Sequence, residues 1–251
     1  MQTRTFKYAG LNPPNSPFHY IFNEKFEEYP GGKETQRIKA PSAIELPGGK
    51  HVAQWAQTAT NPVTGFRPNS DCNGNFTAAK YQSNNNCYNY ACNIATNSFA
   101  VPGRLHGVTV LDSSGQVMKQ KVVAAAQADG LKLLGYASMS LADAFSEVGP
   151  STPENGHIVG LLISDPDPDI KWPGDFHFIR SDDPNGGSWS QKAGCDQVAN
   201  FDFAGNPVSD PSTASWVVNQ GPAKLGGSTA FLAAYKFVAW MFVPIKDVQI
   251  G

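Results

Sequence analysis

The chain has 251 residues, with 19 Lys and Arg against 21 Asp and Glu. This length suits one large domain, and the balanced charge argues against binding to nucleic acid or to an anionic membrane by bulk attraction. We therefore expect a small, neutral or peptide-like ligand. The low charged fraction of 16%, together with 24 Gly and 19 Pro, favours a loop-rich extracellular or cell-envelope protein. The first residues show no signal-peptide pattern, so the compartment stays open.

The N-terminal part of the chain differs in composition from the rest. Residues 11–70 are dense in Pro, Gly, Asn and Thr and lack helical periodicity. Pro-Gly-Gly-Lys occurs at 30–33 and again at 47–50, and both segments are interpreted as turns. We predict that residues 1–70 form a loop-rich arm that belongs to the same domain as residues 71–251.

Three segments in the middle of the chain predict helices. Residues 84–96 begin with three Asn, whose side chains cap helix N-termini. Residues 116–128 place valines on one side and are followed by Gly130, a residue typical of helix ends. A shorter helix is expected over residues 141–147.

Runs rich in β-formers follow at 157–163, 175–180 and 235–243. The last of these lies in an apolar run over residues 230–245 that is interrupted by Lys236. This run is shorter than the ~20 residues of a membrane-spanning helix, so we predict a buried terminal strand and no membrane span. Because helices come first and closely spaced strands later, the sequence predicts an α+β fold with an antiparallel sheet.

The four cysteines, Cys72, Cys87, Cys92 and Cys195, allow two disulfides or a free nucleophile. Cys87 stands at the head of the first predicted helix, where unpaired N–H groups and the helix dipole lower the pKa of a thiol. Cys92 lies inside the same helix, where the dipole helps little. We predict Cys87 as a nucleophile. The alternative is a structural cysteine that is buried or paired with another cysteine.

A cysteine nucleophile needs a base, and two of the five histidines lie in predicted strands. His157 starts the first strand and His177 lies within the second, so antiparallel pairing would bring both toward one end of the sheet. By the two-residue period of a strand, His177 and Arg180 point to opposite faces. The alternative for each histidine is a hydrogen-bonded strand residue without a chemical role.

A cysteine at a helix head, followed much later by Gly-His-Ile-Val-Gly-Leu-Leu-Ile and another β-rich segment, resembles the NlpC/P60, CHAP and papain-like cysteine hydrolases. The resemblance covers roughly residues 84–190. It implies a cysteine-bearing helix packed on an antiparallel sheet within a papain-like catalytic domain. It also implies Cys87 as nucleophile, His157 as base and His177 as the residue that orients the base.

Three residues are candidates for contact with a substrate. Asn86 and Tyr88 flank Cys87, where the related families carry Asp before the cysteine and Ser or Gly after it, and Asn86 is a candidate for an oxyanion site. Trp189 follows a Gly-rich turn, and loops after strands often carry specificity. The alternative for Trp189 is an aromatic cover over the core.

No cofactor and no metal is expected, with zinc bound by Cys and His kept as a minor alternative. The cysteines lack the two-residue gap of common zinc sites. Asp165, Asp167 and Asp169 alternate with prolines and resemble a calcium loop in spacing, but the Gly and the distal Glu of such a loop are missing, so the segment is interpreted as a solvated loop.

Two functions follow from these observations. The resemblance implies a thiol hydrolase of amide or peptide bonds, with bacterial cell-wall peptide as substrate, or a related enzyme that deamidates or transfers an acyl group. The alternative is a secreted, disulfide-braced binding or structural domain without catalysis. The sequence does not indicate an oligomeric state.

Overall fold

The computed structural model describes residues 44–46, 50–52, 85–94, 100–152, 155–170, 172–194, 198–200, 202–204, 206–222 and 230–251. Most of the predicted N-terminal arm, and both Cys72 and Cys195, lie outside the described residues. Within the arm, β1 (Ile44–Leu46) pairs antiparallel with β2 (Lys50–Val52). Of the turn predicted at residues 47–50, residues 47–49 lie outside the described residues, and Lys50 is the first residue of β2.

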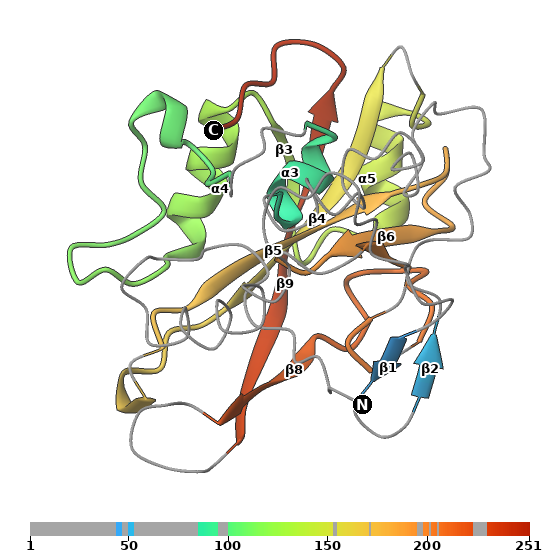
Figure 1. Ribbon diagram of the computed structural model, residues 1–251. Helices are drawn as coiled ribbons and strands as arrows, with labels where there is room; N and C mark the ends of the chain where they lie inside the picture. Colours follow the sequence, from blue (N-terminus) through green and yellow to red (C-terminus); the bar gives the residue numbers. More distant parts are fainter. Residues whose placement is uncertain are drawn as a thin grey trace, which may run out of the picture.

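In the described part of the chain, one seven-stranded antiparallel sheet holds the fold together (Figure 1). Its strands lie in the order β3, β9, β4, β5, β6 and β7, and β8 pairs with β9 outside this path. The strands are β3 (Lys132–Tyr136), β4 (Gly156–Ser164), β5 (Asp175–Ser181), β6 (Trp189–Lys192), β7 (Val198–Ala199), β8 (Val217–Pro222) and β9 (Ala230–Pro244).

Strand β9 is the longest of these strands and has the most strand partners. It pairs with β4 on one side and with β3 on the other, and its first residues pair with β8. In Figure 1 it runs through the whole height of the molecule. Side chains from Ala239 to Val243 are buried, whereas Leu232, Ala234 and Lys236 alternate outward near its start. The prediction of a buried terminal strand is confirmed over residues 239–243. Over residues 232–236 only every second side chain is buried.

The helices cover the sheet. The α-helices are α3 (Cys87–Cys92), α4 (Lys119–Ala128) and α5 (Leu141–Val148), and the 3-10 helices are η2 (Arg104–His106) and η3 (Pro168–Ile170). Helix α3 packs against β5 and β6, whereas α4 and α5 pack against β3. The three predicted helices therefore exist, with α3 and α4 shorter than their predicted ranges. The α+β class is confirmed.

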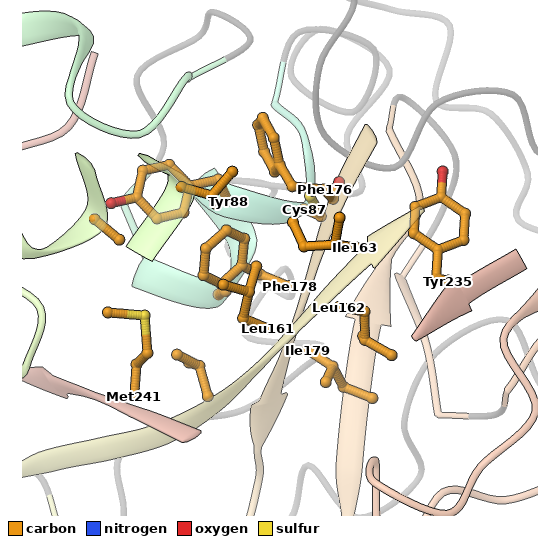
Figure 2. Packing of buried hydrophobic residues seen from close by; sticks show 14 of the residues in the cluster. Cys87, Tyr88, Leu161, Leu162, Ile163, Phe176, Phe178, Ile179, Tyr235 and Met241 are labelled. Carbon is orange, nitrogen blue, oxygen red and sulfur yellow. Dashed lines mark hydrogen bonds between the residues drawn. The ribbon is translucent and has the colours of Figure 1, made fainter. Parts of the chain in front are cut away.

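Both faces of β4 and β5 are buried along their whole lengths. Leu161 pairs with Phe178, and the next pair along, Leu162 with His177, points to the other face. Figure 2 shows this division: Leu161 and Phe178 lie with Tyr88 on one side of the strands, and Leu162 and Ile179 lie on the other.

Among the described strands the sequence predicted β4, β5 and β9 and missed the others, including β3 and β6. Strand β3 reads Lys-Leu-Leu-Gly-Tyr and has a register shift between Leu133 and Gly135, so its pattern does not alternate cleanly. Strand β6 contains Trp189, which was predicted to lie in a loop and instead pairs with Ser181 of β5. Its indole is fully buried and packs against Trp240 with ring centroids 5.6 Å apart.

Candidate functional site

A capping box starts α3 and fixes the position of Cys87. The side chain of Asn86 accepts hydrogen bonds from the backbone N–H groups of Tyr88 and Asn89, both at 3.1 Å, and the side chain of Asn89 accepts from the N–H of Asn86 at 3.0 Å. The Asn-rich sequence therefore forms the helix start that it predicts. Asn86 also donates to the carbonyl of Ala100 at 2.8 Å, which ties α3 to the chain that follows it.

The thiol of Cys87 is enclosed in the hydrophobic core. Its Sγ lies 3.9 Å from the carbonyl oxygen of Phe176, and Figure 2 shows it beside Ile163 and Phe176. Burial, followed by the negative charge of Asp175, raises the pKa of the Cys87 thiol well above its usual value. The expected lowering by the helix start is therefore wrong, because desolvation of the thiolate outweighs the few N–H groups of a six-residue helix.

His157 reaches α3 at a different point. Its Nε2 lies 2.6 Å from the carbonyl oxygen of Ala91, one helical turn beyond Cys87. A carbonyl only accepts, so Nε2 carries the proton and donates it to this bond. Burial, with a smaller effect from the charge of Arg180, lowers the pKa of His157 to about 3. His157 is therefore a neutral imidazole, and its hydrogen bond to Ala91 holds α3 against the sheet.

His177 lies on the opposite face of the sheet from His157. It is the partner of Leu162, an odd number of residues from His157 along β4, so the two imidazoles point away from each other. The Nε2 of His177 lies 2.6 Å from the side-chain oxygen of Gln191. The rings of Phe203, Trp216 and Tyr235 surround it with centroids 5.6 to 6.1 Å away. Burial lowers the pKa of His177 to about 3.

The structure thus does not bring Cys87, His157 and His177 together as a nucleophile, a base and its orienter. Cys87 is the first residue of α3, His157 contacts the same helix from the sheet one turn further along, and His177 belongs to the other face of the sheet. Their catalytic roles stay a prediction for which the geometry offers no support. The proposed opposite orientation of His177 and Arg180 is confirmed, because Arg180 donates to the carbonyl of Tyr90 in α3.

The predicted substrate-contact residues are also buried, so a substrate cannot reach their side chains. Asn86 caps α3, and the hydroxyl of Tyr88 donates to the Asp129 carboxylate at 2.8 Å. The indole N–H of Trp189 donates to the carbonyl of Gly186 at 2.8 Å. All three side chains are fully buried, and each has a structural partner. The alternative for Trp189, an aromatic cover over the core, is the one that the structure supports.

Sequence reasoning missed a buried polar network beneath α3. The guanidinium of Arg180 lies 3.8 Å from the ring centroid of Tyr90, and its Nε is 3.5 Å from a carboxylate oxygen of Asp182. Ser190 donates to the same oxygen at 2.9 Å and lies 2.7 Å from the hydroxyl of Tyr90. All of these side chains are fully buried. The only signal in the sequence was Arg180 on the helix-facing side of an apolar strand, where a charge requires a partner.

The same network extends to the residues around the start of α3. The amine of Lys192 donates to the carbonyl oxygens of Asn85 and Gly194, the latter at 2.7 Å. Burial raises the pKa of Asp182 to about 7, in spite of the opposing charge of Arg180. Arg180 bonds to the backbone of α3, and Lys192 bonds to carbonyl oxygens just before α3 and just after β6, so these two cations fix the helix on the sheet.

Within the described ranges, no three His, Cys, Asp or Glu side chains are close enough to share a metal ion. Cys87 and Cys92 are free thiols, so neither forms the disulfide that the structural alternative considered. Among these residues, too, no helix combines the length and the apolar character needed to cross a bilayer. Fold and site together define an α+β protein in which the side chains of Cys87, Cys92, His157 and His177 are all buried.

Comparison with known proteins gives a specific relationship. No family model matches the chain, and no solved structure matches it. The chain is 36% identical to Insoluble matrix shell protein 1 from Ruditapes philippinarum over 159 residues, which are 63% of this chain and 85% of that protein. The chain therefore belongs to the family of this shell matrix protein.

This relationship corrects the functional class expected from the sequence. The relative is named as a matrix protein of a shell, so the classification as a hydrolase, and specifically as a cysteine peptidase, thiol protease or amidase, is wrong. The cysteine at a helix head misled because an arrangement of helix and sheet does not by itself indicate a function. The resemblance to NlpC/P60, CHAP and papain-like proteins is itself untouched by these comparisons.

Proposed function

We propose that the chain is a non-catalytic structural protein of an insoluble extracellular matrix. The observation that carries this proposal is its 36% identity to Insoluble matrix shell protein 1 over 85% of that protein's length. The low charged fraction of 16% and the many Gly and Pro residues support an extracellular location.

The geometry around Cys87 supports the same proposal. A reactive cysteine needs a thiolate that a substrate can reach. The Cys87 side chain is instead fully buried, and its pKa is raised by burial. The thiol packs against the core residues of β4 and β5. Cys92, at the other end of α3, is buried in the same way.

Thiol labelling tests the structural role of α3. The native protein is treated with iodoacetamide at neutral pH, and the peptides that contain Cys87 and Cys92 are quantified by mass spectrometry. We expect both to react more than about 100-fold more slowly in the native protein than in urea, because labelling requires opening of the core. Rapid native labelling of Cys87 alone would contradict the proposal and indicate an accessible, activated thiol.

Location is tested in the organism that produces the protein. Its extracellular material is extracted with salt, chelator and detergent, and each fraction is probed with an antibody against the folded domain. We expect the protein in the residue that resists extraction. Recovery in the soluble intracellular fraction would overturn the proposal.

A further inference from the structure

Two Asn-Gly pairs in the described part of the chain share the same covalent structure but differ in their surroundings. They are Asn155-Gly156 and Asn185-Gly186, and a third, at residues 73–74, lies outside the described residues. An asparagine before a glycine can lose its side-chain amide, because the glycine nitrogen attacks the side-chain carbonyl carbon and no Cβ obstructs it. This attack requires a side chain that can rotate and a backbone N–H that is not held by a good acceptor. The surroundings of each pair therefore decide whether it reacts.

Asn185 meets both conditions. It lies in the turn between β5 and β6, which starts at Asp183 and has Pro184 in its second position. Its side chain is exposed and has no hydrogen-bond partner among the described residues. The nitrogen of Gly186 lies 3.5 Å from the carbonyl oxygen of Asp183, which is longer than an ordinary hydrogen bond. This nitrogen is therefore held only weakly.

The same turn requires a glycine after Asn185. Gly186 has a φ of 76°, which residues with a side chain rarely adopt, and a Cβ there would overlap the ring of Phe145 in α5. Its carbonyl oxygen also accepts the indole N–H of Trp189 at 2.8 Å. The packing of α5 and β6 on this turn thus excludes the bulkier residue that would slow the attack on Asn185.

Asn155 is also exposed, but its surroundings hold it on every side. Its side-chain amide donates to the carbonyl of Val148 at 2.9 Å. The N–H of Gly156 donates to the carbonyl of Thr152 at 3.0 Å, and the carbonyl of Asn155 accepts from the N–H of Ile245 at 3.1 Å. The attack at this pair therefore requires several hydrogen bonds to break first.

We infer that Asn185 is a site of spontaneous deamidation in the folded protein, whereas Asn155 is protected. The nitrogen of Gly186 bonds to the side-chain carbonyl carbon of Asn185, and ammonia leaves, which forms a cyclic succinimide. Water then opens either carbonyl of the succinimide and yields aspartate or isoaspartate. Each product places a carboxylate beside Asp183, whose side chain accepts from the N–H of residue 185 at 2.8 Å. Isoaspartate also adds a CH₂ to the main chain of the turn, which displaces the Gly186 carbonyl from the indole of Trp189.

Incubation of the purified, folded chain at mildly alkaline pH, followed by peptide mass spectrometry, measures this reaction. Loss of each amide is detected by the change in mass when NH₂ is replaced by OH. We expect Asn185 to react at least about tenfold faster than Asn155, because only the reaction at Asn155 requires local opening of hydrogen bonds. Equal rates at the two sites, or a faster loss at Asn155, would overturn the proposal.

The matched control is the same incubation in guanidinium chloride. Unfolding removes the hydrogen bonds around Asn155, so the two rates should converge. A difference that persists in the unfolded chain would show that local sequence sets it, and the proposal would fail. The rate at Asn185 in the folded protein should also rise with pH, because the attacking nitrogen must lose its proton, and a rate independent of pH would contradict the mechanism.

Two substitutions at the same position test the site and its consequence. Asn185→Gln keeps an amide but lengthens the side chain, so deamidation in this turn should fall to the level of Asn155. Asn185→Asp supplies the new charge with an unaltered main chain. The isoaspartate form of the aged protein, separated by chromatography, should therefore unfold at a lower urea concentration than Asn185→Asp. Identical midpoints would contradict the displacement of the Gly186 carbonyl, and continued deamidation of the turn in Asn185→Gln would contradict the assignment of the site.

Discussion

Charged side chains of this sheet occupy two different environments, one buried and one exposed to solvent. Beneath α3, Arg180 and Asp182 are fully buried and are held by Tyr90 and Ser190. At the start of β9, Lys236 and Asp165 pair in the open beside exposed apolar side chains. The first region uses residues of catalytic type to hold a helix on a sheet, whereas the second leaves its surface available. Residue type alone therefore does not show whether a charged side chain lies in the core or at the surface.

The largest effect that we expect is a loss of folding stability in acid, caused by the buried histidines. His157 and His177 have a pKa of about 3 in the folded protein, against 6.5 in an unfolded chain. The unfolded state therefore binds more protons between these values, and stability falls as pH drops from 6.5 toward 3. Asp182, with a pKa of about 7, acts in the opposite direction between pH 7 and 3.8. The two histidines should outweigh it, and the protein should unfold in acid.

Thermal melting across pH separates these contributions. His157→Gln and His177→Gln should each make the fall in melting temperature below pH 6.5 shallower. Asp182→Asn should make it steeper, because it removes the group that opposes the histidines. Curves that run parallel to the wild type in all three variants would show that these groups do not govern the acid response.

The next largest effect is expected from opening the buried ion pair. Arg180→Ala leaves the Asp182 carboxylate without its cation and the carbonyl of Tyr90 without its donor. We expect a loss of about 3–5 kcal/mol in the free energy of unfolding, measured by urea denaturation. Lys236→Met is the control from the open region, and its midpoint should match the wild type. A loss of similar size in both variants would remove the distinction between the two regions.

A smaller difference should separate the caps of two helices. Asn86 caps the buried helix α3 and also bonds to Ala100, whereas Ser140 caps α5, where it is exposed and accepts from Asp143. We expect Asn86→Ala to cost about 1–2 kcal/mol and Ser140→Ala about 0.5–1 kcal/mol in urea denaturation. A larger cost for Ser140→Ala would indicate that α3 contributes little to the stability of the sheet.

Local patterns predicted much of the fold. The Asn run before Cys87 predicted the start of α3, and Gly130 predicted the end of α4, where it has a φ of 103°. These signals act over a few residues, so they survive in any tertiary setting. The pairing of β9 with both β3 and β4 depends on contacts across the whole chain and has no local signal.

The candidate site was predicted poorly for a physical reason. The sequence showed that Cys87 begins a helix, but not that Phe176 and Ile163 would close over it (Figure 2). It placed His157 and His177 in neighbouring strands, while the register of those strands decided that they point to opposite faces. A one-residue difference in register would have reversed that outcome, and sequence alone does not fix it.

The position of β9 also sets the order in which a nascent chain folds. On the ribosome, β4, β5 and β6 emerge together and can pair with their sequence neighbours. Strand β3 emerges earlier, yet among the described strands its partner is β9. Lys132 therefore cannot form its strand pair until Phe242 has emerged. Until then the edges of β3 and β4 are open to other chains. We therefore expect a chain that lacks β9 to aggregate more readily than the full chain, because the edges of β3 and β4 stay unpaired.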